Sequence, residues 1–445
     1  MKQIKTLLQY STQEFVEYLK SHKIRRFYFV YDSKNKKIFS SHKILNPIAD
    51  FINSDKRDFN LHEGLFFQVT KDYDTLQGAF VHRTNRGQAA GGVRYWSYPN
   101  IEDYLRDGLR LAKGMTHKNA LAGLWWGGGK AVMAHNPAFS KNDPAIRESI
   151  YKEFGELITS LNGCYVTAED VGTNVTDMAN VYSKTRFTTC IPFELGGSGN
   201  PSIPTAKGVI AGMKAAVKFL SDDTLKGKTV ALQGTGNVGI SLIKYLFEEK
   251  VKKIIAVDIS AENVERAKKE FPGKKLIISV VDANDLSFFS TECDILATCA
   301  IGAVLNPVTI PLIKAKIICG AANNQLEDPG KDGNALFKRG IIYIPDFLTN
   351  RMGIVNCSNE QYGYVNNDPF IERHFSKDWK HSIYKTALMV LKKSKKKGQQ
   401  TGKVAVKIAD KLSKENHPVF GHRGRQIINS LIGNKWYEND GFKTS

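Results

Sequence analysis

The sequence predicts an α/β fold in which two domains flank a cleft: an N-terminal α/β domain and a Rossmann-like, doubly wound domain. The chain has 445 residues, which is too long for one ordinary hydrophobic core. Residues 229–344 alternate short β-branched and apolar runs with helical patterns, which indicates a mostly parallel sheet covered by helices. Residues 196–204 lack apolar periodicity and are rich in glycine and proline, as a hinge or domain boundary would be.

The composition is typical of an intracellular globular protein. Hydrophobic residues make up 42% of the chain, and no apolar run is long enough to cross a bilayer. Residues 1–5 lead into polar sequence rather than into the apolar core of a signal peptide. The six cysteines have neither CxxC nor Cys/His ligand spacing, which argues against a disulfide framework and a zinc site. We therefore expect a cytoplasmic protein with reduced thiols, no metal and no membrane attachment.

The formal net charge of +19 is compatible with a nucleic-acid partner, with anionic substrates or with a lysine-rich surface. The densest basic run, residues 392–397, lies near the end of a predicted helix, where cations complement the helix dipole. A surface that binds single-stranded nucleic acid requires aromatic residues on which the bases stack, and none interleave with this run. The pattern favours a solvated helical face over a nucleic-acid site.

The first 57 residues form a small mixed segment without recognisable chemistry. The elements predicted here and just beyond are a helix at 12–19 and strands at 27–31, 65–69 and 78–81, the last two joined by a turn at 71–74. A helix then begins after Asn100, a good N-cap residue, and carries apolar side chains at helical spacing as far as Met115.

Two lysines, Lys118 and Lys130, flank an apolar and glycine-rich stretch. Lys118 falls near the carboxyl end of the predicted helix, and Lys130 follows three consecutive glycines, which we predict to form a turn. Because glycine has no Cβ, such a run lets the backbone approach a ligand and can deliver Lys130 into a poorly solvated site. A lysine there loses its proton more readily than an exposed one. Considered alone, each lysine is better interpreted as a solvated surface charge, since the chain has 63 basic residues.

The second domain begins with a helix predicted from Thr205. A β-branched run at 229–233 follows, and then Gly-Thr-Gly-Asn-Val-Gly at 234–239, which opens the next helix. The following strand ends on Asp258, 19 positions after Gly239. The further predicted strands lie at 277–280, 294–297, 317–319 and 341–344.

This glycine motif indicates a dinucleotide site because it follows a strand, opens a helix and precedes an acidic strand end at the right distance. Gly234 makes the turn, Gly236 lets the backbone approach a pyrophosphate, and Gly239 allows the helix to pack closely on the strand. The helix N-terminus at Asn237 and Val238 supplies N–H groups to the anion.

The acidic strand end bears on the choice of cofactor. Asp258 is expected to bind the adenosine ribose hydroxyls and to repel a 2′-phosphate, which predicts NAD rather than NADP. Lys252 and Lys253 lie nearby, and their positive charges favour a 2′-phosphate and therefore NADP. A nucleotide-free doubly wound domain, in which Asp258 only caps a strand end, is the alternative.

Three further clusters are candidates to line the cleft: residues 167–172, 320–325 and 350–356. In the first, Asp170 is either a turn residue or, beside a desolvated lysine, a second proton carrier of opposite charge. Oxidation of an amine to a ketone requires both an acid and a base. The lysine pair, Asp170 and the glycine motif together point to amine chemistry at a nicotinamide.

Several motifs, in the same order, resemble those of the glutamate/leucine/phenylalanine/valine dehydrogenase family. The principal one is Leu-Trp-Trp-Gly-Gly-Gly-Lys-Ala-Val at 124–132, which closes on Asn136-Pro137. The resemblance spans about residues 60–415, and the leucine and phenylalanine dehydrogenases are the most similar members. The other matching motifs lie at 91–94, 111–116, 168–172, 299–302 and 322–326.

The resemblance implies an NAD-dependent, reversible oxidative deamination of an L-amino acid to its 2-oxo acid and ammonia. It implies that Lys118 binds the substrate α-carboxylate, that Lys130 is the general base activating water, and that Asp170 shuttles a proton on the amino nitrogen. It also implies that Asn323 and Asn324 help to hold the nicotinamide ribose or the substrate carboxylate, and that Thr205 contacts the carboxamide.

The family's organisation implies four segments along the chain. These are an N-terminal extension at 1–57, a substrate and oligomerisation domain at 58–202, an NAD-binding domain at 203–350, and C-terminal helices that return to the substrate domain, with a tail, at 351–445. Members of the family form dimers or larger rings, so a homo-oligomer is expected. Catalysis requires closure of the cleft, which expels water.

The resemblance also bears on the substrate. Glutamate-specific relatives have a lysine where this chain has Ala90, so we expect glutamate to be a poor substrate. The substrate is expected beside Gly91 and Gly92, with its side chain in a pocket formed by Ala90, Ala168, Ile354 and Cys357. These small or apolar residues fit a branched aliphatic or aromatic amino acid. A hydrophobic pocket discriminates one methylene by only about 1 to 3 kcal/mol, so the pattern does not select among them.

Arg351 and Met352 depart from the family pattern. Leucine-type relatives have Ala-Gly-Gly after the asparagine at this point, and the larger side chains are expected to obstruct closure or alter specificity near the nicotinamide. The alternative hypothesis is therefore a catalytically weakened nucleotide-binding sensor or assembly partner of the same fold. The segment at 1–57 and the tail at 417–445 are also unusual in length for the family. They are expected to alter how subunits assemble.

Overall fold

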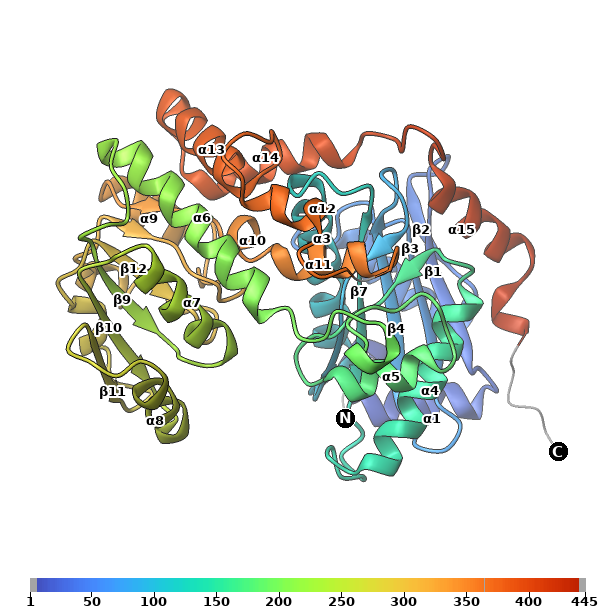
Figure 1. Cartoon of the computed structure of the whole chain (residues 1–445). Coiled ribbons are helices and arrows are strands. Elements are labelled where there is room, and N and C mark those ends of the chain that lie inside the picture. Colours follow the sequence, from blue (N-terminus) through green and yellow to red (C-terminus); the bar gives the residue numbers. More distant parts are fainter. Residues whose placement is uncertain (1–5, 364, 440–445) are drawn as a thin grey trace, which may run out of the picture.

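The computed structural model of the chain describes residues 6–363 and 365–439. These residues form two lobes, each built on its own β-sheet (Figure 1). Two terminal parts of the chain lie outside this range. They are residues 1–5, where no signal peptide was expected, and residues 440–445 at the end of the tail. Within the described ranges, no helix is long and apolar enough to cross a membrane.

The first lobe contains a mixed eight-stranded sheet. Its strand order is β2-β1-β3-β4-β7-β5-β8, and β6 pairs with β7. Neighbours from β2 to β7 are antiparallel, whereas β5 and β6 run parallel to β7. The strands are β1 (Arg26–Asp32), β2 (Lys37–Ser40), β3 (Gly64–Val69), β4 (Leu76–Arg83), β5 (Ala89–Ala90), β6 (Val93–Trp96), β7 (Gly127–Ala134) and β8 (Tyr165–Val166).

Helices cover both faces of this sheet because successive strand side chains point to opposite sides. In β3, Leu65 and Phe67 join one hydrophobic core and Phe66 joins the other. Residues of α1 (Thr12–Ser21), α2 (Asn46–Ser54) and α3 (Ile101–Leu121) complete the first core. Residues of α4 (Pro144–Ser160), α5 (Val175–Tyr182) and α15 (Arg423–Gly433) complete the second.

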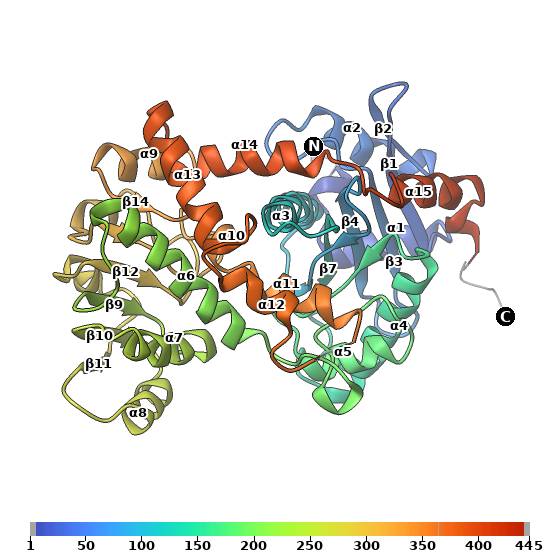
Figure 2. The same ribbon diagram turned by 45° about the horizontal axis from the view of Figure 1, so that its top comes forward.

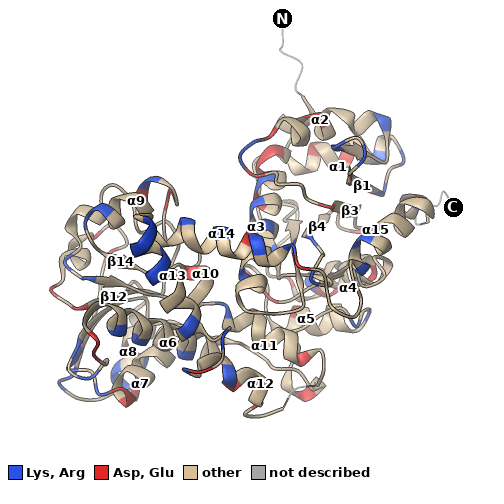
Figure 3. Ribbon diagram, turned by 90° about the horizontal axis from the view of Figure 1, so that it is seen from above, with Lys and Arg blue, Asp and Glu red and all other residues tan. Residues whose placement is uncertain are grey.

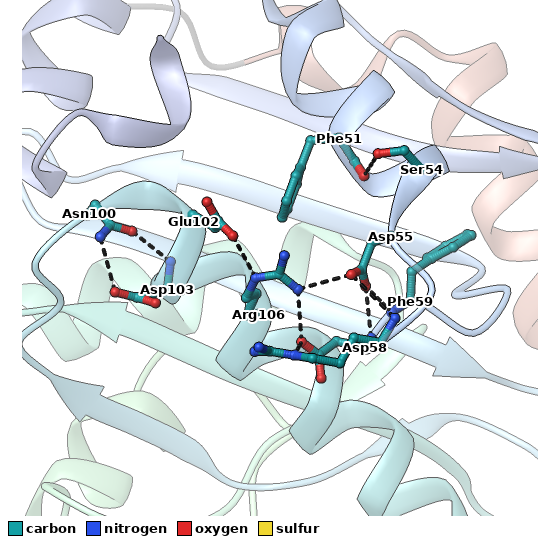
Figure 4. A network of polar contacts seen from close by, with 10 residues as sticks. Phe51, Ser54, Asp55, Asp58, Phe59, Asn100, Glu102, Asp103 and Arg106 are labelled. Carbon is teal, nitrogen blue, oxygen red and sulfur yellow. Dashed lines mark hydrogen bonds and ion pairs between the residues drawn. The ribbon is translucent and has the colours of Figure 1, made fainter. Parts of the chain in front are cut away.

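The N-terminal segment extends the sheet of the first lobe. Its predicted helix and strand are confirmed as α1 and β1, and β1 pairs antiparallel with β3. Arg106 on α3 forms ion pairs with Asp55 at 2.9 Å, Asp58 at 3.1 Å and Glu102 at 2.8 Å (Figure 4). The segment is therefore attached, by strand pairing and by charge, to the helix that carries Lys118.

The start of α3 is confirmed, because the Asn100 side chain accepts a hydrogen bond from the Asp103 amide. The turn predicted at the three glycines is wrong. The chain turns at Gly123, where φ is 73°, and Gly127–Gly129 begin strand β7. A Cβ at Gly128 would lie 2.0 Å from Thr116 Oγ1 on α3. The glycines thus bring a strand against a helix rather than reversing the chain.

The second lobe contains a six-stranded parallel sheet, with order β11-β10-β9-β12-β13-β14. Numbered from its first strand this order is 3-2-1-4-5-6, the arrangement of dinucleotide-binding sheets. Every strand predicted here is confirmed to within two residues. They are β9 (Thr229–Gln233), β10 (Lys253–Asp258), β11 (Leu276–Val280), β12 (Ile295–Thr298), β13 (Ile317–Ile318) and β14 (Ile342–Tyr343).

The C-terminal helices lead from the second lobe back to the first (Figures 1 and 2). α13 (Ile383–Lys397) packs on α6, and α14 (Thr401–Ser413) packs on α3. The dense lysine run occupies the end of α13, as predicted (Figure 3). The other helices are α6 (Ser202–Ser221), α7 (Asn237–Glu248), α8 (Ala261–Glu270), α9 (Lys331–Lys338), α10 (Asp346–Thr349), α11 (Met352–Glu360) and α12 (Pro369–Glu372). Short 3₁₀ turns lie at Leu7–Gln9, Lys43–Leu45, Phe193–Leu195, Ser287–Ser290, Ile310–Leu312, Arg373–Phe375 and Trp436–Glu438.

Candidate active site

A cavity of about 240 Å³ lies between the two lobes, and most of the ionisable residues singled out in the sequence reach it. The first lobe contributes Lys118 from α3, Lys130 from β7 and Asp170 from the loop after β8. The second lobe contributes side chains of Thr205 on α6, Val238 on α7, Asn323 and Asn350. Residues more than 200 positions apart therefore face one space.

Lys130 and Asp170 form a buried ion pair, with 2.8 Å between Nζ and Oδ2. Lys130 is only 3% exposed, and burial lowers the pKa of its ammonium. Burial alone would raise the pKa of Asp170, but the Lys130 and Arg94 cations outweigh it and lower this pKa to about 2. The pair thus joins an amine that releases its proton readily to a carboxylate that stays ionised.

Arg94 orients this pair and was not among the predicted site residues. Its guanidinium lies 3.3 Å from Asp170 Oδ2 through Nε and 2.9 Å from Asp107 Oδ2 through Nη1. Gly92 makes the approach possible, because a Cβ there would lie 2.8 Å from the Asp170 Cβ. The available signal was the position of Arg94 directly after Gly91-Gly92-Val93.

Lys118 differs from Lys130 in the surroundings of its ammonium. Within the described part of the chain, its ammonium forms no hydrogen bond or ion pair, although it interacts at longer range with Asp346. Burial lowers its pKa. An unpaired ammonium at the wall of a cavity is suited to receive an anionic group of a ligand.

Glu169 is a second residue that the sequence reasoning missed. It lines the same cavity, and its Oε2 is buried without a hydrogen-bond partner. Burial, and then the neighbouring carboxylates of Asp177 and Asp170, raise the pKa of Glu169 to about 7. The cavity therefore contains a carboxyl group that titrates near neutral pH, directly beside one that does not.

The apolar wall of the cavity contains three of the four residues expected for the side-chain pocket: Ala168, Ile354 and Cys357. Cys190 and Met115 also line it and were not predicted. Ala90 and Gly91 are not among the described residues that line the cavity. Ala90 is fully buried in β5, where its carbonyl accepts a hydrogen bond from Asn119.

Arg351 and Met352 point away from the cavity. The residues of this segment that line it are Asn350, Gly353, Ile354 and Cys357, which is helical spacing along one face. Arg351 lies on another face, is fully buried, and donates hydrogen bonds to the carbonyls of Leu121 and His381. Met352 packs in the core of the second lobe. This placement removes the obstruction that the sequence suggested.

A second cavity, of about 250 Å³, lies at the carboxyl ends of β9, β10 and β12. Its walls include Gly234, Asp258 and Gly302. The strand order reverses between β9 and β12, and ligands of doubly wound sheets bind at such a point. Gly234 brings the two loops together, because a Cβ there would lie 2.8 Å from the amide nitrogen of Ala300.

The glycine motif has the shape that a pyrophosphate requires. A Cβ at Gly236 would meet no atom within 4 Å, so this glycine faces open space. α7 begins directly after it without a side-chain cap, which leaves N–H groups of Asn237 and Val238 for an anion. Gly239 allows the close packing expected of it, since a Cβ there would lie 2.1 Å from the Gly234 carbonyl oxygen. The residues present fit a dinucleotide.

Asp258 is held by its own loop. Its Oδ2 accepts hydrogen bonds from the Thr235 amide at 2.6 Å and the Thr235 hydroxyl at 3.1 Å, and its Oδ1 accepts one from the Ser260 amide at 2.9 Å. Burial would raise its pKa, but these hydrogen bonds lower it overall. The carboxylate is therefore ionised and retains acceptor capacity on Oδ1.

The asparagines after β13 lie near the two lysines, because Asn323 and Asn324 line a smaller cavity that Lys118 and Lys130 also reach. Asn323 Oδ1 accepts a hydrogen bond from Asn350 Nδ2 at 2.8 Å, which fixes the Asn323 side chain at the wall of the first cavity. The Asn324 amide donates to the carboxylate of Asp346. In the described residues, no group of three or more His, Cys, Asp or Glu is arranged to hold a metal ion.

Two protein-family models match the chain. The Glu/Leu/Phe/Val dehydrogenase dimerisation domain matches residues 66–187, and the Glutamate/Leucine/Phenylalanine/Valine dehydrogenase model matches residues 196–416. The chain belongs to this family. It is an amino acid dehydrogenase, and its Rossmann-type lobe implies a nicotinamide cofactor.

This dehydrogenase is similar over most of its length to characterised relatives. It is 48% identical to a leucine dehydrogenase of Geobacillus stearothermophilus over 304 residues, which is 68% of this chain and 79% of the relative. It is 38% identical to a valine dehydrogenase of Streptomyces albus over 362 residues, 80% of this chain and 94% of the relative. Among solved structures, L-tryptophan dehydrogenase from Nostoc punctiforme superposes with a TM-score of 0.65 at 33% identity, covering 79% of this chain and 96% of that one.

Proposed function

We propose that this dehydrogenase uses NAD to deaminate an apolar L-amino acid, branched-chain or aromatic, reversibly to its 2-oxo acid and ammonia. The observation that carries the proposal is one cavity that joins the Lys130–Asp170 pair to an apolar wall and to Lys118, which no described residue pairs with. These are a base, a proton carrier, an anchor for a carboxylate and a pocket for a hydrophobic side chain.

In the proposed mechanism, Lys118 binds the substrate α-carboxylate and so fixes the position of Cα. Asp170 accepts a proton from the substrate ammonium, which frees the nitrogen lone pair that assists loss of hydride from Cα. When bound, the nicotinamide supplies the hydride acceptor at its C4. Burial of Lys130 favours its neutral amine, which removes a proton from the water that attacks the imino carbon. Asp170 then returns its proton to the nitrogen. As the C–N bond breaks and ammonia leaves, the hydroxyl oxygen forms the carbonyl and passes its proton to the Asp170 carboxylate, from which it is released to solvent.

The proposed contacts of the cofactor follow the two cavities. Gly234, Gly236 and the first residues of α7, Asn237 and Val238, would hold the pyrophosphate, with Gly239 supporting the packing below. Asp258 would accept hydrogen bonds from the ribose hydroxyls, and its negative charge disfavours a 2′-phosphate. Thr205, Asn323 and Asn324 would contact the nicotinamide end.

The proposed substrate class rests on the apolar wall. Ala168, Ile354 and Cys357, together with Cys190, offer no cation for the side-chain carboxylate of glutamate. The curated relatives are named for leucine, valine and phenylalanine, and the similar solved structure for tryptophan. Binding a charged side chain against this wall would leave its charge unpaired, which is costly.

A panel of L-amino acids assayed in parallel with NAD and NADP tests the proposal. We expect reduced cofactor to form with leucine, isoleucine, valine, phenylalanine or tryptophan and NAD, and to form at least about 100-fold more slowly with glutamate, since an unpaired buried charge costs several kcal/mol. A preference for glutamate, or for NADP, would contradict it. Absence of turnover with every amino acid would favour the nucleotide-binding sensor instead.

We also propose that the dehydrogenase is a homo-oligomer. The family model that matches residues 66–187 describes a dimerisation domain, and these residues supply most of the sheet in the first lobe. Light scattering on the purified full chain would give a mass at least twice 49.7 kDa. A monomeric mass at micromolar concentration would contradict this part of the proposal.

A further inference from the structure

Two cysteine sulfurs lie in contact in the substrate cavity. Cys190, in the loop before α6, and Cys357, on α11, have their Sγ atoms 3.0 Å apart, although they are separated by 167 positions in the sequence. A disulfide bond is about 2.05 Å long, so the two sulfurs need to approach by roughly 1 Å to be joined. Within the described residues, no other two sulfurs lie within hydrogen-bonding distance of one another.

The contact is held by the surrounding structure. Glu360, three positions after Cys357 on α11, accepts hydrogen bonds from the backbone amides of Cys190, Ile191 and Ser198, at 3.0, 3.1 and 3.0 Å. The Cys190 loop and α11 are thus joined directly beside the two sulfurs. Because the backbone positions are fixed before any reaction, little conformational entropy is lost when the sulfurs are joined.

The cavity also supplies a route to the sulfurs. Cys190 and Cys357 are 2% and 3% exposed, yet both line the space that Lys118 and Lys130 face. A molecule smaller than an amino acid can reach them along the path proposed for the substrate. Cys164 and Cys319 are fully buried and do not line this cavity.

We propose that Cys190 and Cys357 form an oxidative modification site in which a small peroxide joins them as a disulfide inside the substrate pocket. One thiolate attacks a peroxide oxygen, the O–O bond breaks, and the proton released from that thiol ends in a water molecule. The resulting sulfenic acid is attacked by the second sulfur, and its hydroxyl leaves as a second water molecule with the second thiol proton. Two thiols lose two electrons and two protons, and the peroxide gains them.

The environment of the pair sets the rate of this reaction. The hydrogen bond to Cys357 and burial raise the pKa of the Cys190 thiol well above its usual value. Since the thiolate is the nucleophile, oxidation is slow at neutral pH and accelerates as the pH rises. An amino acid in the cavity blocks the path of the peroxide.

The disulfide changes the wall that the substrate side chain contacts. It draws α11 and the Cys190 loop together one helical turn from Ile354. This consequence rests on the proposed function, and we expect oxidation to raise KM for large side chains more than for small ones. The disulfide would be reversed by a dithiol reductant.

The test uses the full-length reduced protein treated with hydrogen peroxide at pH 7 and pH 9, followed by alkylation in denaturant and peptide mass mapping. We expect a linked pair of peptides that contain Cys190 and Cys357, with loss of two hydrogens, and alkylation at the other four of the six cysteines. The link should form at least tenfold faster at pH 9, and saturating leucine with NAD should slow it. The proposal is overturned if Cys190 and Cys357 are recovered as alkylated thiols under conditions that oxidise Cys293 and Cys299, which are partly exposed.

Matched variants separate the pair from the other thiols. Cys190→Ser should abolish the linked peptide, whereas Cys293→Ser should leave it unchanged. The mapping of the unaltered protein decides the proposal even where a variant folds poorly. Because the link is read by mass, it forms or fails independently of turnover: a link without amino acid oxidation contradicts only the proposed function, and turnover without a link contradicts only this inference.

Discussion

The Nζ atom of Lys130 lies 2.8 Å from Oδ2 of Asp170, and these two side chains come from a strand and from a loop on opposite sides of β6. Since the proposed chemistry needs both members, replacing Lys130 by alanine should lower kcat by about 10²- to 10⁴-fold, as the loss of a general base does. Cofactor affinity, measured by fluorescence titration with NADH, should stay within a factor of about two. Lys152→Ala is the control, because Lys152 forms an exposed pair with Glu148 and does not line the cavity. Unchanged turnover in Lys130→Ala would refute the assigned role.

Replacing Lys118 by alanine should act mainly on binding of the carboxylate. A hydrogen bond to a charged group contributes about 1.5 to 3 kcal/mol, which corresponds to a rise in KM of roughly 10- to 150-fold. The same factor should appear in the inhibition constant of 4-methylpentanoate, which has the carboxylate of leucine but no amino group. An inhibition constant equal to that of the unaltered protein would show that Lys118 does not bind the carboxylate.

Glu169 should make stability depend on pH. Its pKa is raised from 4.5 to about 7 in the folded protein, so the folded state binds more protons than the unfolded state between these values. Stability contributed by the neutral form is therefore lost as the pH rises from about 4.5 to 7. Allowing for partial exposure, Glu169→Gln should be more stable than the unaltered protein at pH 8 by about 1 to 2 kcal/mol and equally stable at pH 4.5. Urea unfolding at the two pH values checks this, and a difference independent of pH would contradict it.

Arg351 should matter for stability and not for specificity. Its removal leaves the buried carbonyl of Leu121 and the partly buried carbonyl of His381 without their donor, and the buried group alone costs about 1 to 3 kcal/mol. Arg351→Ala should therefore lower the melting temperature by several degrees. The ratio of kcat/KM for leucine to that for phenylalanine should not change, because Arg351 does not line the cavity. A changed ratio without a loss of stability would mean that its side chain reaches the substrate.

Deletion of residues 1–57 should prevent folding of the first lobe. It exposes the edge of β3 and removes the core side chains Phe27 and Phe29, along with the Asp55 partner of Arg106. We expect the truncated chain to accumulate in the insoluble fraction on expression, since a bare hydrophobic edge strand promotes aggregation. A soluble truncated protein with full activity would show that the segment is dispensable. Arg106→Ala, which leaves the strand in place, should remain soluble.

Local sequence patterns were sufficient to predict the second lobe. Its strands are short β-branched runs separated by helices, and each can be recognised without knowledge of the others. The glycine triplet could not be assigned in this way. Whether Gly127–Gly129 turn or extend is decided by Thr116 and Arg83, which lie across the fold, and not by their immediate neighbours.

The candidate site was predictable where a residue belongs to a motif. The cavity brings together Lys118, Lys130 and Asp170, which the family motifs had marked. Cys190 lies outside these motifs, and Glu169 lies in the motif at 168–172 without a role assigned to it there. The raised pKa of Glu169 and the sulfur contact of Cys190 arise from burial and from partners in other segments. Arg351 was misjudged for the same reason, since its size was evident in the sequence but the face of the helix it occupies was not.

The absence of side chains at Gly127–Gly129 also limits which substitutions this region can accept in evolution. Any side chain at Gly128 would push β7 and α3 apart, and with them the two lysines that these elements carry. A single methyl group would therefore alter the separation between the proposed anchor and the proposed base, which in our proposal matches the part that all amino acids share. Under the proposed function, substitutions at Ile354 or Cys357 would admit new substrates, whereas the stretch from Lys118 to Lys130 would have to be inherited as a unit.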